Sequence, residues 1–315
     1  MHVPDGFLDA KTAAGTAALS VIGLGVALRH LRKDFPRSRV PLIGLSAAFI
    51  FAAQMLNFPV MGGTSGHLVG GVLVAVLLGP HAAILVMSSV IILQCLLFAD
   101  GGVTALGANV FNMAILAPGI GYMIYRSVKR MSGSNLRGRL LAAGFAAWCS
   151  TVAAAVACAG QLAFSGTVPW RIVFPAMTNL HMLIGLGEAL ITTLVIYALS
   201  RSHAGLFADE QQPAFQPRIR ELIVYGLLIS AGLAIFVAPF ACPWPDGLER
   251  VAANLGFGTH DAGQPLIPSP LHDYTIPGIQ SAVASTVLAG LIGIVVVFCL
   301  AYLLARRLAP SECSR

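Results

Sequence analysis

Long apolar runs separated by short polar connections dominate the chain. Most runs approach the roughly 20 residues with which an α-helix crosses about 30 Å of hydrocarbon. The pattern therefore predicts an all-α, polytopic transmembrane helical bundle with about nine membrane segments. These segments lie at residues 10–28, 40–58, 68–78, 81–98, 104–125, 140–164, 174–200, 221–240 and 279–305.

Segment 68–78 is too short for a full crossing, because about 1.5 Å per residue covers only about half a bilayer. The stretch before it, Pro59 to Gly66, is glycine-rich and uncharged. Irregular backbone at membrane depth is tolerated only where protein or a cavity surrounds it. We therefore expect a loop that dips into the protein, with His67 below the membrane surface.

The amino-acid composition excludes several classes of protein. Fifty-seven per cent of the 315 residues are hydrophobic and 10% are charged, against roughly 25% charged in soluble domains; mean hydropathy is +0.82. These values exclude a soluble globular enzyme, a disordered chain and a fibrous repeat. The net charge of +6 is clustered, and we relate it to the bilayer rather than to nucleic acid.

The positive residues lie in alternate connections. Residues 29–39 and 126–139 carry five Lys or Arg each, and residues 201–220 and 306–315 carry three each. Because cytoplasmic loops are enriched in Lys and Arg, we expect the N-terminus outside and the C-terminus in the cytoplasm of a multi-pass cell-membrane protein.

The polar stretch around residues 201–220 contains two prolines and resembles a linker. It predicts a membrane domain over 1–205, a cytoplasmic linker over 206–220, and a two-helix unit over 221–315. That unit carries a long outer loop, 241–278, with six prolines. Long loops of this kind are often functional.

The first residues form a possible chelator. The acidic opening with Pro4 lacks the features of a secretory signal, so we expect the mature chain to begin at or near residue 1. Met1 then offers its α-amine, and His2 offers its backbone amide and imidazole. Three planar nitrogens plus the imidazole of His67 would complete a square plane, which suits Ni(II) or Cu(II). An ordinary exposed terminus is the alternative.

The neighbouring residues suit a short, stiff hook. Pro4-Asp5-Gly6 favours a turn, and Asp9 can cap the first helix. Two further groups lie within an apolar segment, His181 and Glu188, seven residues apart and on one helix face. They are functional candidates or a structural hydrogen-bonded pair. We read Gln94, Asp100, Asn109 and Asn112 as interhelical hydrogen bonding and capping.

Catalytic signatures are missing from the sequence. It contains no GxxxxGK[ST], HExxH or GxSxG motif, so the chain does not hydrolyse nucleotide itself and is not expected to be an enzyme. A membrane metalloenzyme would need a base beside an open metal position. A secondary metal permease would need coupling groups. Neither signature is evident, although the permease remains the alternative.

Several stretches resemble a known family. Met1 to Leu8 (MHVPDGFL), Gly62 to Gly71, Gln94 to Met113 and His181 to Thr192 are similar to the substrate-capture component of energy-coupling-factor cobalt/nickel transporters, CbiM or NikM. The match extends to about residue 205. It implies a seven-helix capture core with the ion in a square plane, bound by the Met1 amine, the His2 amide and imidazole, and His67.

The C-terminal part resembles the N component of the same system. Pro245 to Glu249 reads PDGLE, and Ser269 to Tyr274 with Pro277-Gly278 is similar to a second motif. His272 departs from the residue expected there, which leaves its role open; delivery of metal by His260 and His272 is unsupported. The resemblance implies that this unit helps to load or release metal.

The resemblance also implies partners: a membrane scaffold (T) component and two cytoplasmic ATPase subunits. The expected function is that of the substrate-specific component of an ATP-driven uptake system for Ni(II) or Co(II). The ion is the transported ligand, and no tightly bound cofactor is expected. The ligand atoms do not distinguish nickel from cobalt.

Overall fold

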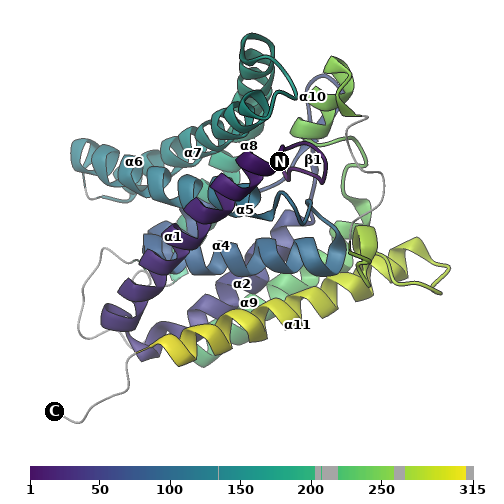
Figure 1. Ribbon diagram of the computed structural model, residues 1–315. Helices are drawn as coiled ribbons and strands as arrows, with labels where there is room; N and C mark the ends of the chain where they lie inside the picture. Colours follow the sequence, from purple (N-terminus) through teal and green to yellow (C-terminus); the bar gives the residue numbers. More distant parts are fainter. Residues whose placement is uncertain (134, 203–206, 208–218, 259–266, 310–315) are drawn as a thin grey trace.

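The computed structural model describes residues 1–133, 135–202, 207, 219–258 and 267–309. Over these residues the chain is an almost purely helical bundle, with one small β-hairpin at the end of the bundle where the N-terminus lies (Figure 1). Short 3₁₀ turns occupy Arg37–Arg39, Ala238–Phe240 and His272–Tyr274, and π-helical turns occupy Gln94–Phe98 and Val110–Leu116. The helices are α1 (Ala10–Asp34), α2 (Val40–Gln54), α3 (Gly71–Leu78), α4 (Pro80–Leu93), α5 (Leu106–Asn109), α6 (Ala117–Ser132), α7 (Leu136–Phe164), α8 (Trp170–Ser202), α9 (Ile219–Phe236), α10 (Gly247–Leu255) and α11 (Ala282–Leu308).

Seven helical stretches in the described residues are long and apolar enough to cross a membrane. They coincide with seven of the nine predicted segments. The other two, 40–58 and 68–78, form α2 with 15 residues and α3 with 8 residues. The prediction of an all-α polytopic bundle is confirmed, and segment 68–78 is short as predicted, whereas the helix in segment 40–58 is shorter than predicted.

The glycine-rich stretch before His67 is more regular than the predicted loop. Phe58–Val60 (β1) pairs antiparallel with Thr64–Gly66 (β2). Gly62 and Gly63 at the turn both have positive φ, a conformation that glycine adopts without a Cβ clash. The hairpin ends one residue before His67, which leads into α3.

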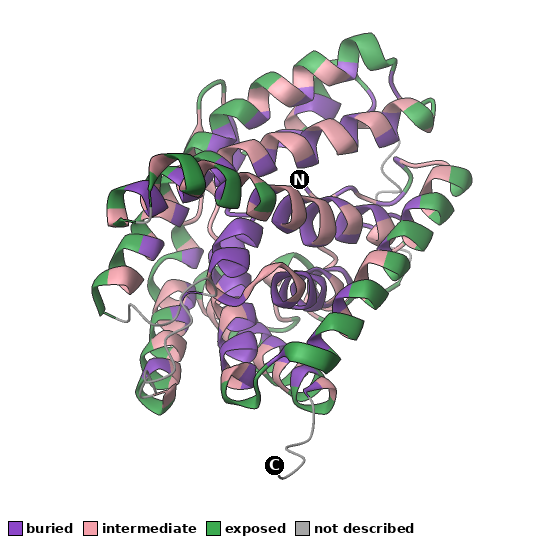
Figure 2. Cartoon of the chain, turned by 90° about the vertical axis from the view of Figure 1, so that its left-hand side faces the viewer, coloured by how far each residue is buried: buried purple, intermediate pink, exposed green. Residues whose placement is uncertain are grey.

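The bundle is built around α2, α3 and α4. Most residues of these helices are buried, and Figure 2 shows buried residues facing inward and exposed ones outward. The outer helices instead expose large hydrophobic side chains, among them Leu186 and Leu190 on α8 and Leu228 on α9. Such outward apolar faces are what a lipid environment requires.

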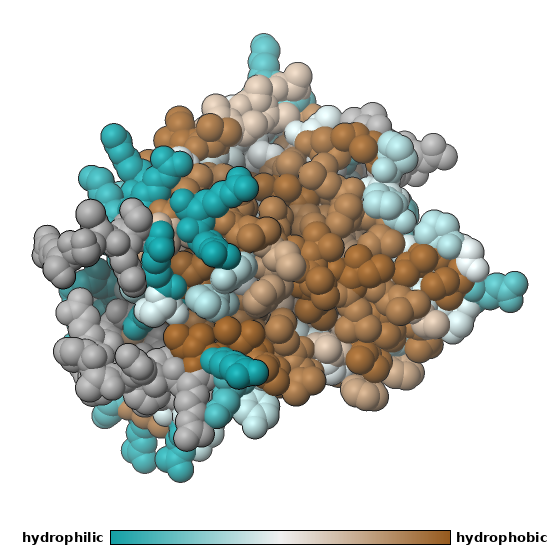
Figure 3. Space-filling model, turned by 90° about the horizontal axis from the view of Figure 1, so that it is seen from below, coloured by the Kyte–Doolittle hydropathy of each residue, from teal (hydrophilic) through white to brown (hydrophobic). Residues whose placement is uncertain are grey.

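Hydrophilic side chains gather at one end of the molecule. Figure 3 shows a broad hydrophobic face with a hydrophilic cluster on the left, where Figure 1 places the C-terminal ends of α1 and α11. The last turns of both helices are basic: α1 carries Arg32 and Lys33, and α11 carries Arg306 and Arg307. Most of the predicted linker lies outside the described residues, since only Phe207 is described within 203–218.

The C-terminal helices α9 and α11 pack directly against α2, so this unit is part of the bundle. The outer loop 241–278 is not simply a loop, because it contains the nine-residue helix α10. Asp246 caps α10: its side chain accepts the Glu249 N–H, and the Glu249 side chain accepts the Asp246 N–H. This capping box is readable in the sequence, but the loop prediction missed it.

Candidate metal centre

The first nine residues fold back onto the bundle as a hook. Gly6 has a φ of 88° within a turn over residues 5–6, and the Asp9 side chain accepts the Thr12 N–H at 3.0 Å to cap α1. Both local predictions are confirmed. The hook buries Met1 and Val3, whose exposed fractions are 5% and 0%. The N-terminus is therefore an internal part of the protein.

Asn109 on α5 and Gly102 hold the hook in place. The Val3 N–H donates to Asn109 Oδ1 at 2.7 Å, and Asn109 Nδ2 donates to the Val3 carbonyl at 3.1 Å. The Gly102 N–H donates to the same carbonyl at 2.9 Å. A Cβ at Gly102 would collide with the backbone nitrogen of Asp5, so the close approach requires glycine.

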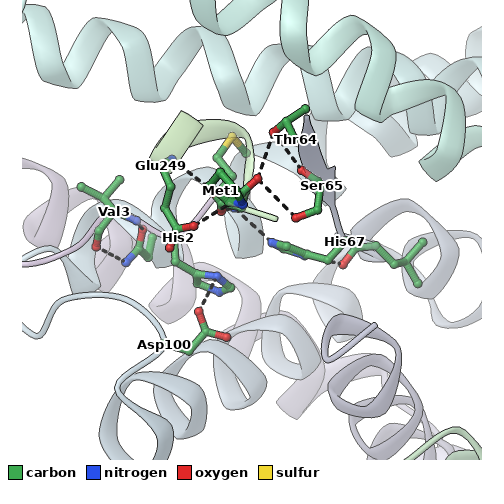
Figure 4. Close-up of polar contacts among 12 residues, drawn as sticks. Met1, His2, Val3, Thr64, Ser65, His67, Asp100 and Glu249 are labelled. Atoms are coloured by element: carbon green, nitrogen blue, oxygen red, sulfur yellow. Dashed lines mark hydrogen bonds and ion pairs between the residues drawn. The ribbon is translucent and has the colours of Figure 1, made fainter. Parts of the chain in front are cut away.

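The Met1 amine lies between two side chains from distant parts of the chain (Figure 4). It is 3.0 Å from His67 Nε2 and donates to Asp246 Oδ2 at 2.6 Å. The Met1 side chain is only 3% exposed and that of Asp246 14%. The terminal ammonium is therefore a buried cation with one carboxylate and one imidazole as partners.

His67 presents a lone pair to this amine. Its Nδ1 is 3.1 Å from the Leu68 carbonyl, a contact in which Nδ1–H donates and which leaves Nε2 as the acceptor. Burial, followed by the nearby Met1 ammonium and His2, lowers the pKa of His67 to about 3. The imidazole is therefore neutral at physiological pH, as a metal ligand must be.

Glu188 on α8 fixes the backbone that follows His67. Its two carboxylate oxygens accept the N–H groups of Val69 and Gly70 at 2.6 and 2.8 Å. The predicted His181–Glu188 pair is wrong as a mutual hydrogen bond. His181 Nδ1 donates instead to the Met177 carbonyl at 2.8 Å, one turn earlier on α8.

The ring of His2 is held by a third carboxylate. His2 Nδ1 lies 2.9 Å from Asp100 Oδ1, while Nε2 is buried without a partner among the described residues. The His2 and His67 rings stack with centroids 5.4 Å apart. The Tyr274 hydroxyl donates to Asp100 Oδ2 at 2.7 Å, so a residue of the C-terminal unit orients the carboxylate that holds His2.

The charges of these groups reinforce one another. Burial lowers the pKa of the Met1 amine, but the adjacent Asp246 outweighs it, and the net pKa is raised. Burial likewise opposes ionisation of Asp246 and Asp100, yet the Met1 ammonium and His2 respectively hold the pKa of each carboxyl well below its usual range. Both carboxylates are therefore ionised, Asp246 beside the Met1 amine and Asp100 beside His2.

A cavity of ≈ 680 Å³ adjoins the site. His2 and His67 lie in its wall, and the partly exposed His272 and Asp273 show where it meets solvent. The acidic residues that line this cavity are Asp5, Asp100, Asp246, Glu249 and Asp273. A cavity lined by carboxylates attracts cations and raises their concentration inside it.

The structure brings the three predicted site residues, Met1, His2 and His67, together. Sequence reasoning missed Asp246 and Tyr274, which reach the site from the C-terminal unit, and it assigned Asp100 only to interhelical bonding. Of the other polar residues noted, Asn112 bonds Gln161 between helices as predicted, whereas Gln94 bonds Tyr274 of the outer loop and Asn109 bonds the Val3 backbone of the hook. His260 lies outside the described residues.

No three His, Cys, Asp or Glu side chains gather closely enough to hold a metal ion in the part of the chain that the structure describes. Two nitrogens of other kinds, the Met1 amine and the His2 amide, lie beside the imidazoles of His2 and His67.

Comparisons with known proteins show which families the chain matches. Residues 2–206 match the family model "Cobalt uptake substrate-specific transmembrane region", and residues 220–309 match the PDGLE domain. The fused nickel transport protein NikMN of Rhodobacter capsulatus is 31% identical, over 94% of this chain and 95% of that protein. An Archaeoglobus fulgidus protein with the provisional name fused nickel transport protein NikMN is 38% identical, over 97% and 98%.

Solved structures of transition metal transporters are also similar to this chain. A crystal structure of a truncated transition metal transporter is 36% identical and superimposes with a TM-score of 0.59. It matches over its whole length and over 64% of this chain. The likeness therefore extends over much of the chain without covering all of it.

Proposed function

Since the chain belongs to the cobalt uptake substrate-specific transmembrane family, with a PDGLE domain fused behind it, we propose that its N-terminus captures Ni(II) or Co(II) for uptake. The protein is a multi-pass membrane transport component. The ligands in this proposal are the Met1 amine, the His2 amide and imidazole, and the His67 imidazole, arranged as a square plane.

One distance carries the proposal. Bonds as long as the zinc–nitrogen bonds of proteins, about 2.0–2.1 Å, would give neighbouring ligands in a square plane a separation of about 2.8–3.0 Å. Met1 N and His67 Nε2 are 3.0 Å apart. Two donors separated by 66 positions in the sequence thus already lie at the spacing of one edge of the square. Two further edges, from the Met1 amine to the His2 amide and from that amide to the His2 imidazole, would be closed by short chelate rings, and the last edge would join the two imidazoles.

When the metal ion binds, its ligand nitrogens must give up the contacts that they make within the protein. The Met1 amine must leave Asp246 and release a proton before its lone pair can bind. His2 Nδ1, the ring nitrogen that closes a six-membered chelate with the amide, must leave Asp100. Asp100 can then accept the Nε2–H of the turned ring, the arrangement that commonly supports metal-bound histidines. His67 needs only a small adjustment.

The donor set favours late transition metals. Displacing an amide proton requires a metal late in the Irving–Williams order, and planar nitrogen donors suit Ni(II). Mg²⁺ and Ca²⁺ prefer oxygen ligands. The names of the relatives include nickel and cobalt transport proteins, and the site leaves the choice between these two ions open.

Transport itself is proposed to depend on partners. The sequence contains no phosphate-binding loop, so ATP hydrolysis belongs to two separate cytoplasmic ATPase subunits coupled through a membrane scaffold component. Within the chain we propose a capture domain over 1–205, a linker over 206–220 and the PDGLE unit over 221–315. The clustered basic helix ends support a cytoplasmic C-terminus and an outer N-terminus.

The test compares Ni(II) and Co(II) binding to three purified proteins: the native chain, a chain with one extra residue before Met1, and a chain with the same residue added after Arg315. The N-terminal addition preserves every side chain but moves the free amine away from His67. We expect binding to collapse only in the N-terminally extended protein. Equal binding by all three would refute the terminal chelate.

A further inference from the structure

Asp246 connects the C-terminal unit to the N-terminal amine across 245 positions of sequence. Both of its carboxylate oxygens are used. Oδ1 accepts the Glu249 N–H at 2.9 Å and caps α10, whereas Oδ2 accepts from the Met1 ammonium at 2.6 Å. The helix cap therefore fixes the orientation in which the carboxylate meets the amine.

The segment around Asp246 is also anchored to the hairpin that carries His67. The Ser65 N–H donates to the Pro245 carbonyl at 2.9 Å, and Ser65 Oγ donates to the Trp244 carbonyl at 2.7 Å. Arg250 on α10 donates to the Gly62 carbonyl at 3.0 Å. Figure 4 shows Ser65 and His67 close to Met1. The start of α10 and the hairpin are thus bonded to each other, and the amine lies between Asp246 on one side and His67 on the other.

We propose that Asp246 is the built-in counter-ion of the metal-free chelate: it holds the Met1 ammonium in the site, and an arriving ion must displace it. This inference rests on the proposed function, because it assumes that the amine becomes a metal ligand. On loading, the ammonium gives one proton to water in the adjoining cavity, and its lone pair bonds to the metal. Asp246 is then a positioning residue of the PDGLE unit, which controls access to the amine.

Two other roles of Asp246 must be separated from this one. It caps α10, and it contributes negative charge to the cavity. Asp246→Asn retains the cap, because Asn caps helices as well as Asp, and it removes the charge that faces the amine. Asp273→Asn is the matched control, since it removes one charge from the same cavity at a side chain that is 79% exposed and bonded to His272.

The first measurement uses metal-free protein and does not depend on metal binding. Purified protein is treated with an amine-acetylating reagent near neutral pH, and mass spectrometry follows modification of the Met1 α-amine. Loss of a charge-assisted hydrogen bond should free the terminus, so Asp246→Asn should be acetylated at least about tenfold faster than the native chain. Asp273→Asn should match the native rate. An unchanged rate in Asp246→Asn would overturn the proposal.

The second measurement is the association rate of Ni²⁺ by stopped-flow spectroscopy. Each variant loses one unit of attractive charge, so Asp273→Asn should bind somewhat more slowly than the native chain. Asp246→Asn should bind faster than Asp273→Asn, because no ion pair has to be displaced. A rate equal to or below that of Asp273→Asn would show that Asp246 only attracts cations, which contradicts the proposal.

The two proposals fail in different ways. Ni²⁺ binding that survives the N-terminal extension refutes the chelate itself. If the extension abolishes binding while Asp246→Asn changes neither the acetylation rate nor the association rate relative to Asp273→Asn, the chelate stands and the counter-ion role of Asp246 is refuted.

Discussion

Glu188 offers a sharp test of how the bundle positions His67. The carboxylate on α8 accepts two backbone N–H groups, from Val69 and Gly70, and thereby orders the turn that follows His67. Gly70 has a φ of 80° there, and a Cβ would collide with Ile50. Glu188→Gln keeps the size and shape of the side chain but can offer an acceptor to only one of the two N–H groups.

The expected cost follows from this geometry. One hydrogen bond to a charged acceptor is lost, worth about 1.5–3 kcal/mol, and a buried N–H is left facing the amide NH₂ group. We take the total as about 3 kcal/mol. If ion binding must restore the order of this turn, the same energy is subtracted from metal affinity, which corresponds to a loss of about a hundredfold.

The assay is Ni²⁺ affinity of purified protein by calorimetry, alongside thermal unfolding. Asn112→Ala is the control, because it breaks a buried pair of hydrogen bonds between Asn112 and Gln161 away from the site. It should lower the unfolding temperature with little effect on affinity. Native-like Ni²⁺ affinity in Glu188→Gln would refute the reasoning that the two hydrogen bonds to the Glu188 carboxylate position His67.

Three further predictions follow from the same contacts. Asn109→Ala leaves the buried Val3 N–H unpaired, at about 2 kcal/mol, so calorimetry should show Ni²⁺ binding weakened by about 30-fold; unaltered affinity would contradict the role of Asn109 in holding the hook. Tyr274→Phe removes the donor that orients Asp100 and should weaken Ni²⁺ binding by about tenfold, while acetylation of Met1 stays at the native rate; equal affinity in the two proteins would exclude this orienting role. Ni²⁺ binding should tighten as pH rises, because the ion displaces a proton from the Met1 amine and another from the His2 amide. The pKa of the amine is raised overall, since the effect of Asp246 outweighs that of burial. His67, with a pKa of about 3, adds no proton release near neutrality, and calorimetry in buffers of different ionisation enthalpy should count about two protons per ion; none would refute the amine and amide as ligands.

Local and periodic features of the fold were predictable from sequence. Apolar runs of spanning length predict the long helices, and Asp9 and Pro4-Asp5-Gly6 predict the first cap and turn. The length of α2 was overestimated, because the apolar run continues past Gln54 into the hairpin. Hydropathy does not distinguish a helix from a short apolar strand such as β1, since both bury the same residue types.

The site was predictable only where the chemistry is local. Met1 and His2 are adjacent, so their chelate rings can be read from the sequence, and the glycine-rich setting of His67 marks a close approach of backbone. Asp246 and Tyr274 could not be placed, because their contacts depend on how α10 and the outer loop pack. His181 and Glu188 show the opposite error: residues seven apart share a helix face but lie two turns from each other.

The most direct test of the central claim is X-ray absorption and magnetic measurement on the Ni²⁺-loaded full chain. The account predicts a diamagnetic, square-planar ion whose first shell contains four nitrogens and no carboxylate oxygen. A paramagnetic, six-coordinate ion with oxygen ligands would contradict it, because the ion would then be bound by the acidic cavity and not by Met1, His2 and His67.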